Sequence, residues 1–454
     1  MKKQKFRKNR PYVKSILAII AMFACTSICL GEHTTTINSD LTYDGGDGQR
    51  LAPPVAGNSD KANGTVNDDG IFPLDPNKCT LIIDEGASVG GTSGARIGAG
   101  SAFRSMTYNK VIVNGGNFND SRIRGALSLS GGDVDVKDNT VEINAGNGIR
   151  GVHGGFTRNG TASGNKVFIK NKVTIERFVN GGCVASNGNA KNNEVTITDA
   201  TVKGNVFGGY VYDNGSAINN TVSISGGKIG YDDDIDSGNV YGGRASNETA
   251  SGNKVFIKNK ATIGGYVIGG FVFGNGNAKN NEVTITDATV NMNVLGGYVN
   301  DNGSAINNTV SISGGKIGND DDIDSGNVYG GRASNGTASS NKVFIKNEAT
   351  IGGLVIGGGV NGNGNAESNE VTITDATANK DVYGGVVIGN GDAKDNKVTI
   401  DGGIVKRDVY GGTVVGNGNA TGNKVFIKNK VTIVALFFIN TLLPEAVSLD
   451  ARPP

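Results

Sequence analysis

One short phrase recurs along most of this chain, and it limits the possible folds more than any other feature. The phrase is Asn-x-Val-x-Ile, and from Asn165 onward its copies begin 28, 27, 33, 28, 27, 33, 28, 27 and 27 residues apart, so 88-residue blocks are themselves duplicated. A fixed period of 20–50 residues indicates a repeat architecture in which each unit stacks on the next. Copies begin at Asn139, Asn165, Asn193, Asn220, Asn253, Asn281, Asn308, Asn341, Asn369, Asn396 and Asn423, with looser versions at Asn77 and Asn109.

Within one unit, hydrophobic and polar residues alternate, which is the pattern of a β-strand with one buried face. In the unit that begins at Asn281, this strand contains Val283 and Ile285. Two further short strands are expected, one at Val294 and the other at Tyr298. Three strands and three turns in about 27 residues predict one coil of a right-handed parallel β-helix. No stretch shows sustained helical spacing, so the predicted fold class is all-β.

Stacking explains why the unit is repeated. Each coil would pair with the next through backbone hydrogen bonds about 4.8 Å apart, and equivalent Val and Ile residues would form columns inside the solenoid. The Asn residues would form an amide ladder of the kind found in cross-β stacks. The pair Gly296 and Gly297 permits a sharp bend or a close backbone approach. The repeats predict about 12–13 coils of roughly 27 residues each.

The composition along the chain divides it into four segments. Residues 1–31 combine a basic start with a short apolar run and small residues, which is the layout of a secretory signal peptide. Residues 32–76 are polar and are interpreted as a flexible or capping segment. Residues 77–433 form the repeat domain, and the divergent residues 434–454 are expected to be a cap or the product of a truncated or frame-shifted reading frame.

Charge and cysteine content exclude two classes of interaction. The whole chain has a net charge of +1, but residues 1–31 hold seven Lys or Arg and no acid, so the remainder has a net charge of −6. An acidic chain gives no electrostatic case for nucleic-acid binding. Cys79 and Cys183 are about four units apart, too far for a disulfide in a stacked solenoid, and are expected to be small buried hydrophobic residues.

Two acidic insertions, at residues 231–238 and 319–326, account for the two 33-residue steps. Their Asp residues have the alternate spacing of calcium-binding loops, but the glycine comes one place late and no bidentate Glu follows. A solvated acidic loop is therefore the preferred interpretation, calcium is the alternative, and no other cofactor is expected. The possible calcium ligands are Asp232, Asp234 and Asp236 in the first insertion and Asp320, Asp322 and Asp324 in the second.

No catalytic residue is assigned from the sequence. Beyond residue 31 the chain has two histidines, and no partner pattern surrounds either of them. His33 is expected in a mobile start and His153 in a glycine-rich turn. Carboxylate pairs could serve glycoside cleavage, but the carboxylates lie at turns and no non-repeating cluster marks one cleft.

One column of side chains is a possible ligand-contact surface. The residue after Val in the recurring Val-x-Gly-Gly is aromatic or aliphatic, and alternation would direct it outward if the Val points inward. A stripe of such side chains would be an exposed apolar patch. A corner at which both residues are partly buried is the preferred interpretation. The aromatic members of this column are Phe207, Tyr241, Tyr329, Tyr383 and Tyr410.

Units of the type Val-Tyr-Gly-Gly-x-Val-x-Gly-Asn-Gly-Asn-Ala-x-x-Asn-x-Val-x-Ile after a signal peptide resemble the β-helical passengers of bacterial autotransporter adhesins, which use type V secretion. The resemblance covers residues 77–433 and rests on repeat style. It implies export across the inner membrane, display outside the outer membrane and a C-terminal β-barrel translocator. The sequence up to Pro454 departs from the family because it has no alternating membrane strands, which favours a fragment, a released protein or a periplasmic one.

The functional expectation is therefore a non-enzymatic, adhesin-like rod, exported to the cell surface or the medium, that binds host or cell-surface glycans or proteins through a repeated face. Two alternatives stay open. One is a β-helical enzyme that cleaves polysaccharides, either a lyase or a glycoside hydrolase. The other is a truncated autotransporter fragment without activity.

Overall fold

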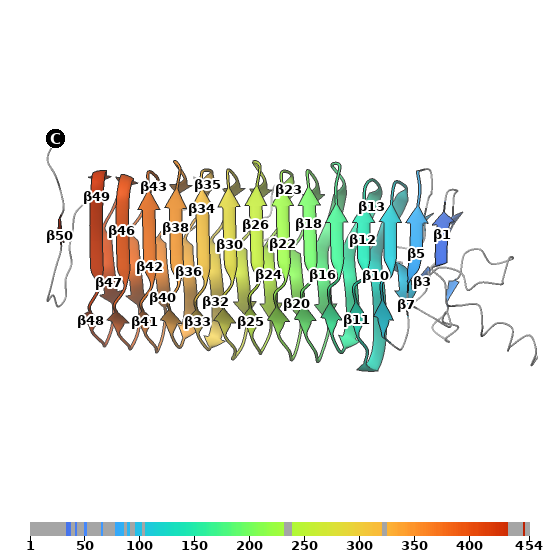
Figure 1. Cartoon of the computed structure of the whole chain (residues 1–454), viewed down its shortest axis with the longest axis horizontal. Coiled ribbons are helices and arrows are strands. Elements are labelled where there is room, and N and C mark those ends of the chain that lie inside the picture. Colours follow the sequence, from blue (N-terminus) through green and yellow to red (C-terminus); the bar gives the residue numbers. More distant parts are fainter. Residues whose placement is uncertain are drawn as a thin grey trace, which may run out of the picture.

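The protein is a parallel β-solenoid, as the repeats predict. The structure, a computed structural model, describes residues 78–85, 105–230, 238–319 and 325–434, together with short strands at 33–37, 41–42, 50–51, 65–66, 89–90, 96–101 and 448–449. These residues form about 12 coils of about 27 residues and contain no helix. Figure 1 shows the coils stacked along one axis, in sequence order from β5 to β49.

Over residues 194–394, each of seven coils has four strands rather than the predicted three, and in the coils on either side two of these strands are continuous. In the coil that follows Asn253, a first strand, β26 (Lys254–Lys258), and a third strand, β28 (Val267–Val272), alternate with the two-residue strands β27 (Thr262–Ile263) and β29 (Ala278–Lys279). The prediction was wrong because it divided the third strand at the glycine pair and missed the two short strands.

Strands at equivalent positions form continuous ladders, and nearly all pairs are parallel. The first-strand ladder contains β5 (Cys79–Ile83), β9 (Lys110–Val113), β12 (Thr140–Ile143), β15 (Lys166–Ile169), β18 (Glu194–Thr198), β22 (Thr221–Ser225), β26, β30 (Glu282–Thr286), β34 (Thr309–Ser313), β38 (Lys342–Lys346), β42 (Glu370–Thr374), β46 (Lys397–Val405) and β49 (Lys424–Ile433). The third-strand ladder contains β7 (Arg96–Ser101), β10 (Asn117–Asp133), β13 (Asn147–Asn159), β16 (Thr174–Val184), β20 (Val206–Val211), β24 (Val240–Ala245), β28, β32 (Val294–Asn302), β36 (Val328–Asn335), β40 (Val355–Val360), β44 (Val382–Val387) and β47 (Val409–Val414).

The two-residue strands complete the coils. The second-strand ladder contains β19 (Thr201–Val202), β23 (Lys228–Ile229), β27, β31 (Thr289–Val290), β35 (Lys316–Ile317), β39 (Thr350–Ile351) and β43 (Thr377–Ala378). The fourth-strand ladder contains β8 (Met106–Thr107), β11 (Val136–Lys137), β14 (Ala162–Ser163), β17 (Ala190–Lys191), β21 (Ala217–Ile218), β25 (Ala250–Ser251), β29, β33 (Ala305–Ile306), β37 (Ala338–Ser339), β41 (Ala366–Glu367), β45 (Ala393–Lys394) and β48 (Ala420–Thr421). The remaining strands are β1 (His33–Ile37), β2 (Leu41–Thr42), β3 (Arg50–Leu51), β4 (Thr65–Val66), β6 (Val89–Gly90) and β50 (Ser448–Leu449).

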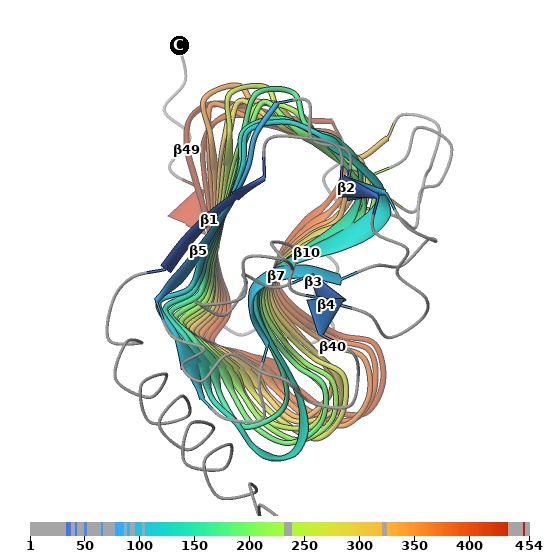
Figure 2. The same cartoon turned by 90° about the vertical axis from the view of Figure 1, so that its right-hand side faces the viewer.

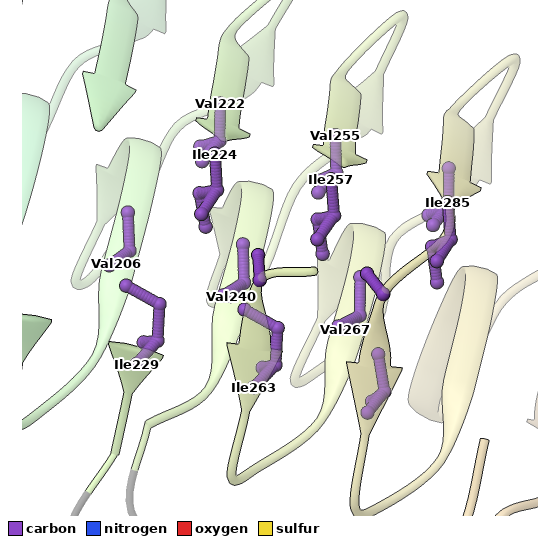
Figure 3. Close-up of a cluster of buried hydrophobic side chains, with 14 of the residues drawn as sticks. Val206, Val222, Ile224, Ile229, Val240, Val255, Ile257, Ile263, Val267 and Ile285 are labelled. Atoms are coloured by element: carbon purple, nitrogen blue, oxygen red, sulfur yellow. The ribbon is translucent and has the colours of Figure 1, made fainter. Parts of the chain in front are cut away.

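The interior is built from columns of identical aliphatic residues. Val222, Val255 and Val283 are partners in adjacent first strands, and each is fully buried. Figure 3 shows Val222 and Ile224 pointing into the same interior space as Val206 of the facing wall. The alternation along each first strand therefore places its aliphatic side chains in the core, as predicted.

The predicted amide ladder is present and is buried. Each Asn side chain donates from Nδ2 to Oδ1 of the Asn in the next coil; the distance from Asn253 to Asn281 is 3.0 Å. The same Oδ1 accepts the backbone N–H of Asn253 at 3.0 Å, and Nδ2 of Asn281 also donates to the Ala250 carbonyl at 3.0 Å. All four hydrogen-bonding positions of such an amide are used, so it can be buried without the usual desolvation penalty. The ladder runs through Asn109, Asn139, Asn165, Asn193, Asn220, Asn253, Asn281, Asn308, Asn341, Asn369, Asn396 and Asn423.

The glycine pair of the third strand lies against this ladder. A Cβ atom at Gly270 would come within 2.3–2.5 Å of the three amide atoms of Asn281. The wall therefore approaches the Asn side chain more closely than any other residue type would permit. Val206 and Val211, which flank one pair, belong to separate buried clusters on the two sides of the contact. Figure 2 shows the wall that contains β7, β10 and β40 curving toward the middle of the cross-section.

Three local predictions differ from the structure. The looser copy of the repeat that was expected to begin at Asn77 begins at Cys79. Thr80 is the strand partner of Lys110, so the residue equivalent to Asn109 is Cys79. His153 lies within strand β13 rather than in a turn. His33 begins strand β1, which adds in parallel to β5, and so is not in a mobile start. Cys79 and Cys183 are buried and form no disulfide with each other, as predicted.

We expect Asn281→Ala to destabilise the protein strongly, whereas Asn302→Ala is nearly neutral. The first change leaves two N–H donors of Asn253 and the Ala250 carbonyl without partners in the interior, at about 1–3 kcal/mol each. Asn302 also donates to an Asn in an adjacent coil, but it is exposed, so its loss costs about 0.5 kcal/mol or less. Urea denaturation measures both, and equal midpoints for the two variants would contradict a structural role of the buried ladder.

A double-mutant cycle tests the close contact itself. Gly270→Ala alone should be strongly destabilising, because its Cβ would overlap the amide of Asn281. All three overlapping atoms belong to that amide, so in the Asn281→Ala background Gly270→Ala should cost much less. Additive losses of unfolding free energy would show that the glycine is required for another reason.

Candidate functional site

The third-strand wall curves inward (Figure 2), and we name its concave outer face, which carries Phe207, Tyr210 and their equivalents in other coils, the groove. In each third strand, the alternation of inward and outward side chains is interrupted at the glycine pair. Two side chains three residues apart, such as Phe207 and Tyr210, therefore both face the groove. These side chains form a cluster separate from the solenoid interior. The groove is therefore a second packed surface, on the side of the wall opposite to the main core.

The predicted contact stripe is the first column of this groove. Strand pairing places Phe207 beside Tyr241 and Tyr383 beside Tyr410, with rings stacked at 5.0 and 4.8 Å. The stripe is less exposed than an open patch would be. Phe207 and Tyr241 are only 5% and 8% exposed, and Tyr329, like the other two tyrosines, is half-buried. The concave wall and the neighbouring rings cover these side chains, which lie in an extended strand and not at a corner.

A second groove column, three residues further along each strand, was not singled out in the sequence. It contains Tyr210, Phe271 and Tyr298, and two of its positions are arginines, Arg244 and Arg332. The Arg244 guanidinium lies 5.1, 5.8 and 5.4 Å from the ring centres of Tyr210, Tyr241 and Phe271. Such cation–π contacts hold a guanidinium in place without neutralising its charge.

The first coils of the groove form a cleft of about 590 Å³. Here the first column is polar in three successive coils, since Arg124, His153 and Asn180 are strand partners. Asn180 Nδ2 lies 3.2 Å from His153 Nδ1, and its own Oδ1 is buried without a hydrogen-bond partner. The cleft is lined by Arg122, Arg124, His153, Phe156, Phe178, Asn180, Cys183, Ala185, Asn205, Phe207, Tyr210, Tyr212 and Arg244.

This cleft is the non-repeating cluster that the sequence analysis did not find. The signal was present as polar residues at the aromatic position, but the irregular spacing before Asn165 hid the alignment of Arg124 and His153 with later coils. The described lining contains three arginines and no carboxylate, so it lacks the carboxylate pair that glycoside hydrolysis requires. This lining suits a ligand with an anionic group, which an arginine would bind, and a ring, which Phe or Tyr would contact.

The groove changes character toward its last coils. The Tyr383 hydroxyl donates to Asp381 and the Tyr410 hydroxyl donates to Asp408, each at 3.2 Å. Burial and the adjacent Asp408 raise the pKa of Tyr410 to about 12. The groove therefore runs from an arginine-rich end to an end that contains carboxylates.

Burial controls the other titratable groups of the cleft. Burial raises the pKa of the Cys183 thiol to about 12, so this cysteine stays protonated and acts as a small hydrophobic residue. Burial, and then the positive charges of Arg124 and Arg122, hold the pKa of His153 well below its usual value near 6.5. His153 is thus neutral at physiological pH and packs at 5.4 and 5.0 Å from the rings of Phe156 and Phe178.

The other candidate surfaces carry less chemistry. The outer face of the first-strand ladder has shallow depressions beside Phe256 and Phe344, lined mostly by Ser, Thr and Lys. The possible calcium ligands Asp232, Asp234, Asp236, Asp320, Asp322 and Asp324 lie outside the described residues. Within the described part of the chain, no group of three or more His, Cys, Asp or Glu is arranged to hold a metal ion.

Comparisons with protein-family models, with curated proteins and with solved structures found no match for this chain. Over the described ranges, the fold includes no helix with the length and hydrophobicity that crossing a membrane would require.

We expect His153 to make stability depend on pH below about 6.5. In the folded protein the ring stays neutral, whereas in the unfolded chain it takes up a proton near pH 6.5. Protonation therefore favours the unfolded state, and the free energy of unfolding should fall by up to about 1.4 kcal/mol per pH unit below that value. Melting temperatures of the wild type and of His153→Gln at pH 7.5 and 5.0 test this. An equal decrease in both proteins would contradict it.

Proposed function

We propose that this protein is a non-enzymatic, adhesin-like rod that is exported and binds host or cell-surface ligands through its groove. The observation that carries the proposal is the pair of groove columns, in which aromatic and arginine side chains recur in successive coils on the outer side of the wall. These side chains are separate from the aliphatic columns and the amide ladder that hold the coils together. The groove side chains are therefore available to bind a ligand.

Exposed rings at the rim of the groove support a binding role. Tyr212 and Phe273 directly follow the third strands β20 and β28 and are 58% and 53% exposed. Tyr212 lies 4.7 Å from the ring of Tyr210, and Phe273 lies 6.5 Å from the ring of Phe271, so both continue the groove surface into solvent. Aromatic residues are enriched at contact sites, so their position next to a cleft favours a role in binding.

Repetition gives such a rod its affinity. Equivalent weak sites along one rigid body bind a polymeric or clustered ligand with a high effective concentration after the first contact. Duplication of the 88-residue block adds sites without changing the fold, because each coil pairs only with its neighbours. This is the mechanism that we propose for adhesion.

Binding of the purified protein to host cells and to an array of glycans and proteins tests the proposal. We expect Tyr212→Ala combined with Phe273→Ala to weaken binding by at least about tenfold, the effect of losing a central aromatic contact. Tyr108→Ala is the control, because Tyr108 is 60% exposed but is not among the groove residues.

Two results would contradict a binding function of the groove. One is equal binding by the double variant and the control variant. The other is release of reducing ends or unsaturated sugars from a polysaccharide by the wild type, which would instead make the protein an enzyme.

A further inference from the structure

Arg244 is the residue around which the groove has the most specific chemistry. Its strand partners in the two adjacent coils are Tyr210 and Phe271, and its guanidinium lies on the rings of both. At the rim, the exposed rings of Tyr212 and Phe273 lie in the same two adjacent coils. Arg244 therefore lies in the coil between two coils that carry exposed aromatic rings at the rim, and these two coils are about 10 Å apart.

The guanidinium of Arg244 has unused hydrogen-bonding capacity. Its Nε is buried without an acceptor, and none of the ion pairs of the described residues includes this arginine. An arginine carries five N–H donors in a planar fork that matches a carboxylate or a sulfate. Fixed by three rings and lacking a carboxylate partner among the described residues, Arg244 is preorganised to bind an anionic group from outside the protein.

A second arginine of the groove also lies on aromatic rings. Arg332 lies three coils further along the second column and 5.4 and 5.3 Å from the rings of Tyr298 and Tyr329. Its Nε is also buried without an acceptor. At about 4.8 Å per coil the two arginines are about 14 Å apart along the groove. Two cationic sites on one line fit a linear ligand that carries acidic groups at intervals.

We infer that the groove binds an acidic polysaccharide, with Arg244 and Arg332 each pairing with a carboxylate or sulfate of the chain and with the rings of Tyr212 and Phe273 contacting its sugars. This inference rests on the proposed binding function and specifies its ligand class. The polysaccharide lies along the coils that contain the two arginines. It ends before the last coils, because Asp381 and Asp408 would repel it.

The groove favours a polysaccharide over the two other extended anionic polymers. A single nucleic-acid strand carries roughly one charge per 3.4 Å, whereas the arginines of this column are about 14 Å apart. An extended peptide that binds through its backbone adds to the open edge of a sheet. The groove floor is the face of a sheet whose strands are paired on both sides, so it offers no such edge.

The experiment measures binding of the purified protein to defined probes by calorimetry. The probes are a heparin oligosaccharide, which carries sulfates, an oligogalacturonate, which carries carboxylates, neutral dextran, a poly-glutamate peptide and oligo-thymidylate. The variants are Arg244→Gln, Arg332→Gln and Tyr212→Ala. Lys254→Gln is the matched control, because it removes one positive charge from the outer face of the first-strand ladder.

We expect one or both acidic oligosaccharides to bind, and dextran to bind at least tenfold more weakly. Arg244→Gln and Arg332→Gln should each weaken binding by tenfold or more, Tyr212→Ala by about fivefold, and Lys254→Gln by less than twofold. Tyr212 is exposed, so its variant remains informative if an arginine variant fails to fold. The probe that binds better identifies sulfate or carboxylate as the preferred acid.

Other results would overturn the inference. Dextran binding as tightly as the acidic sugars, tighter binding of the peptide or of oligo-thymidylate, or equal losses for Arg244→Gln and Lys254→Gln would each exclude an acidic polysaccharide in this groove. The proposed adhesive function would survive these results if the protein still bound cells through Tyr212 and Phe273. Absence of binding to cells and to every probe would overturn both.

Discussion

The buried contact between the asparagine ladder and the glycine pair determines most of this structure. An amide is costly to bury, and it becomes tolerable only when every donor and acceptor has a partner. Here the partners come from the coil before and the coil after, as Asn281 shows by bonding to Asn253, Asn308 and the Ala250 carbonyl. A slip of one residue in any coil would leave two amides unsatisfied. The ladder therefore fixes the register of the coils, which the aliphatic columns alone would specify less strictly.

Register in turn aligns the surface. Because each ladder Asn from Asn165 onward lies opposite a glycine pair, the third-strand wall is drawn inward at the same point in coil after coil. The side chains just before and just after the glycines then form two columns on the concave outer side. On a convex wall, Phe207 and Tyr241 would be a row of solvated rings. In the groove both are almost fully buried, and Phe207 still borders the cleft. The geometry of the candidate site is thus a consequence of the fold's most conspicuous internal contact.

The sequence predicted those features that depend on a period and a residue type. Alternation placed Val283 and Ile285 inside, and recurrence of Asn in an otherwise aliphatic strand predicted the amide ladder. The concave wall could not be predicted, because it depends on the distance between Gly270 and Asn281, which lie in different strands of one coil. The polar cluster of Arg124, His153 and Asn180 was missed for a related reason. Its members become equivalent only through strand pairing, across spacings that the repeat does not keep.

A division of roles follows from these observations. Ladder asparagines and interior valines are the same in nearly every coil because each must match the coil on either side. The groove positions face no such requirement, and one column carries arginine, histidine, asparagine, phenylalanine, tyrosine, isoleucine and leucine in successive or nearby coils. Variation is thus concentrated on the outer face of the wall and not in the core. Arg244 and Arg332 show the other effect of repetition, since copying one block placed an arginine on aromatic rings twice on one line. In the proposed function, two weak contacts to a single polymer would act together there.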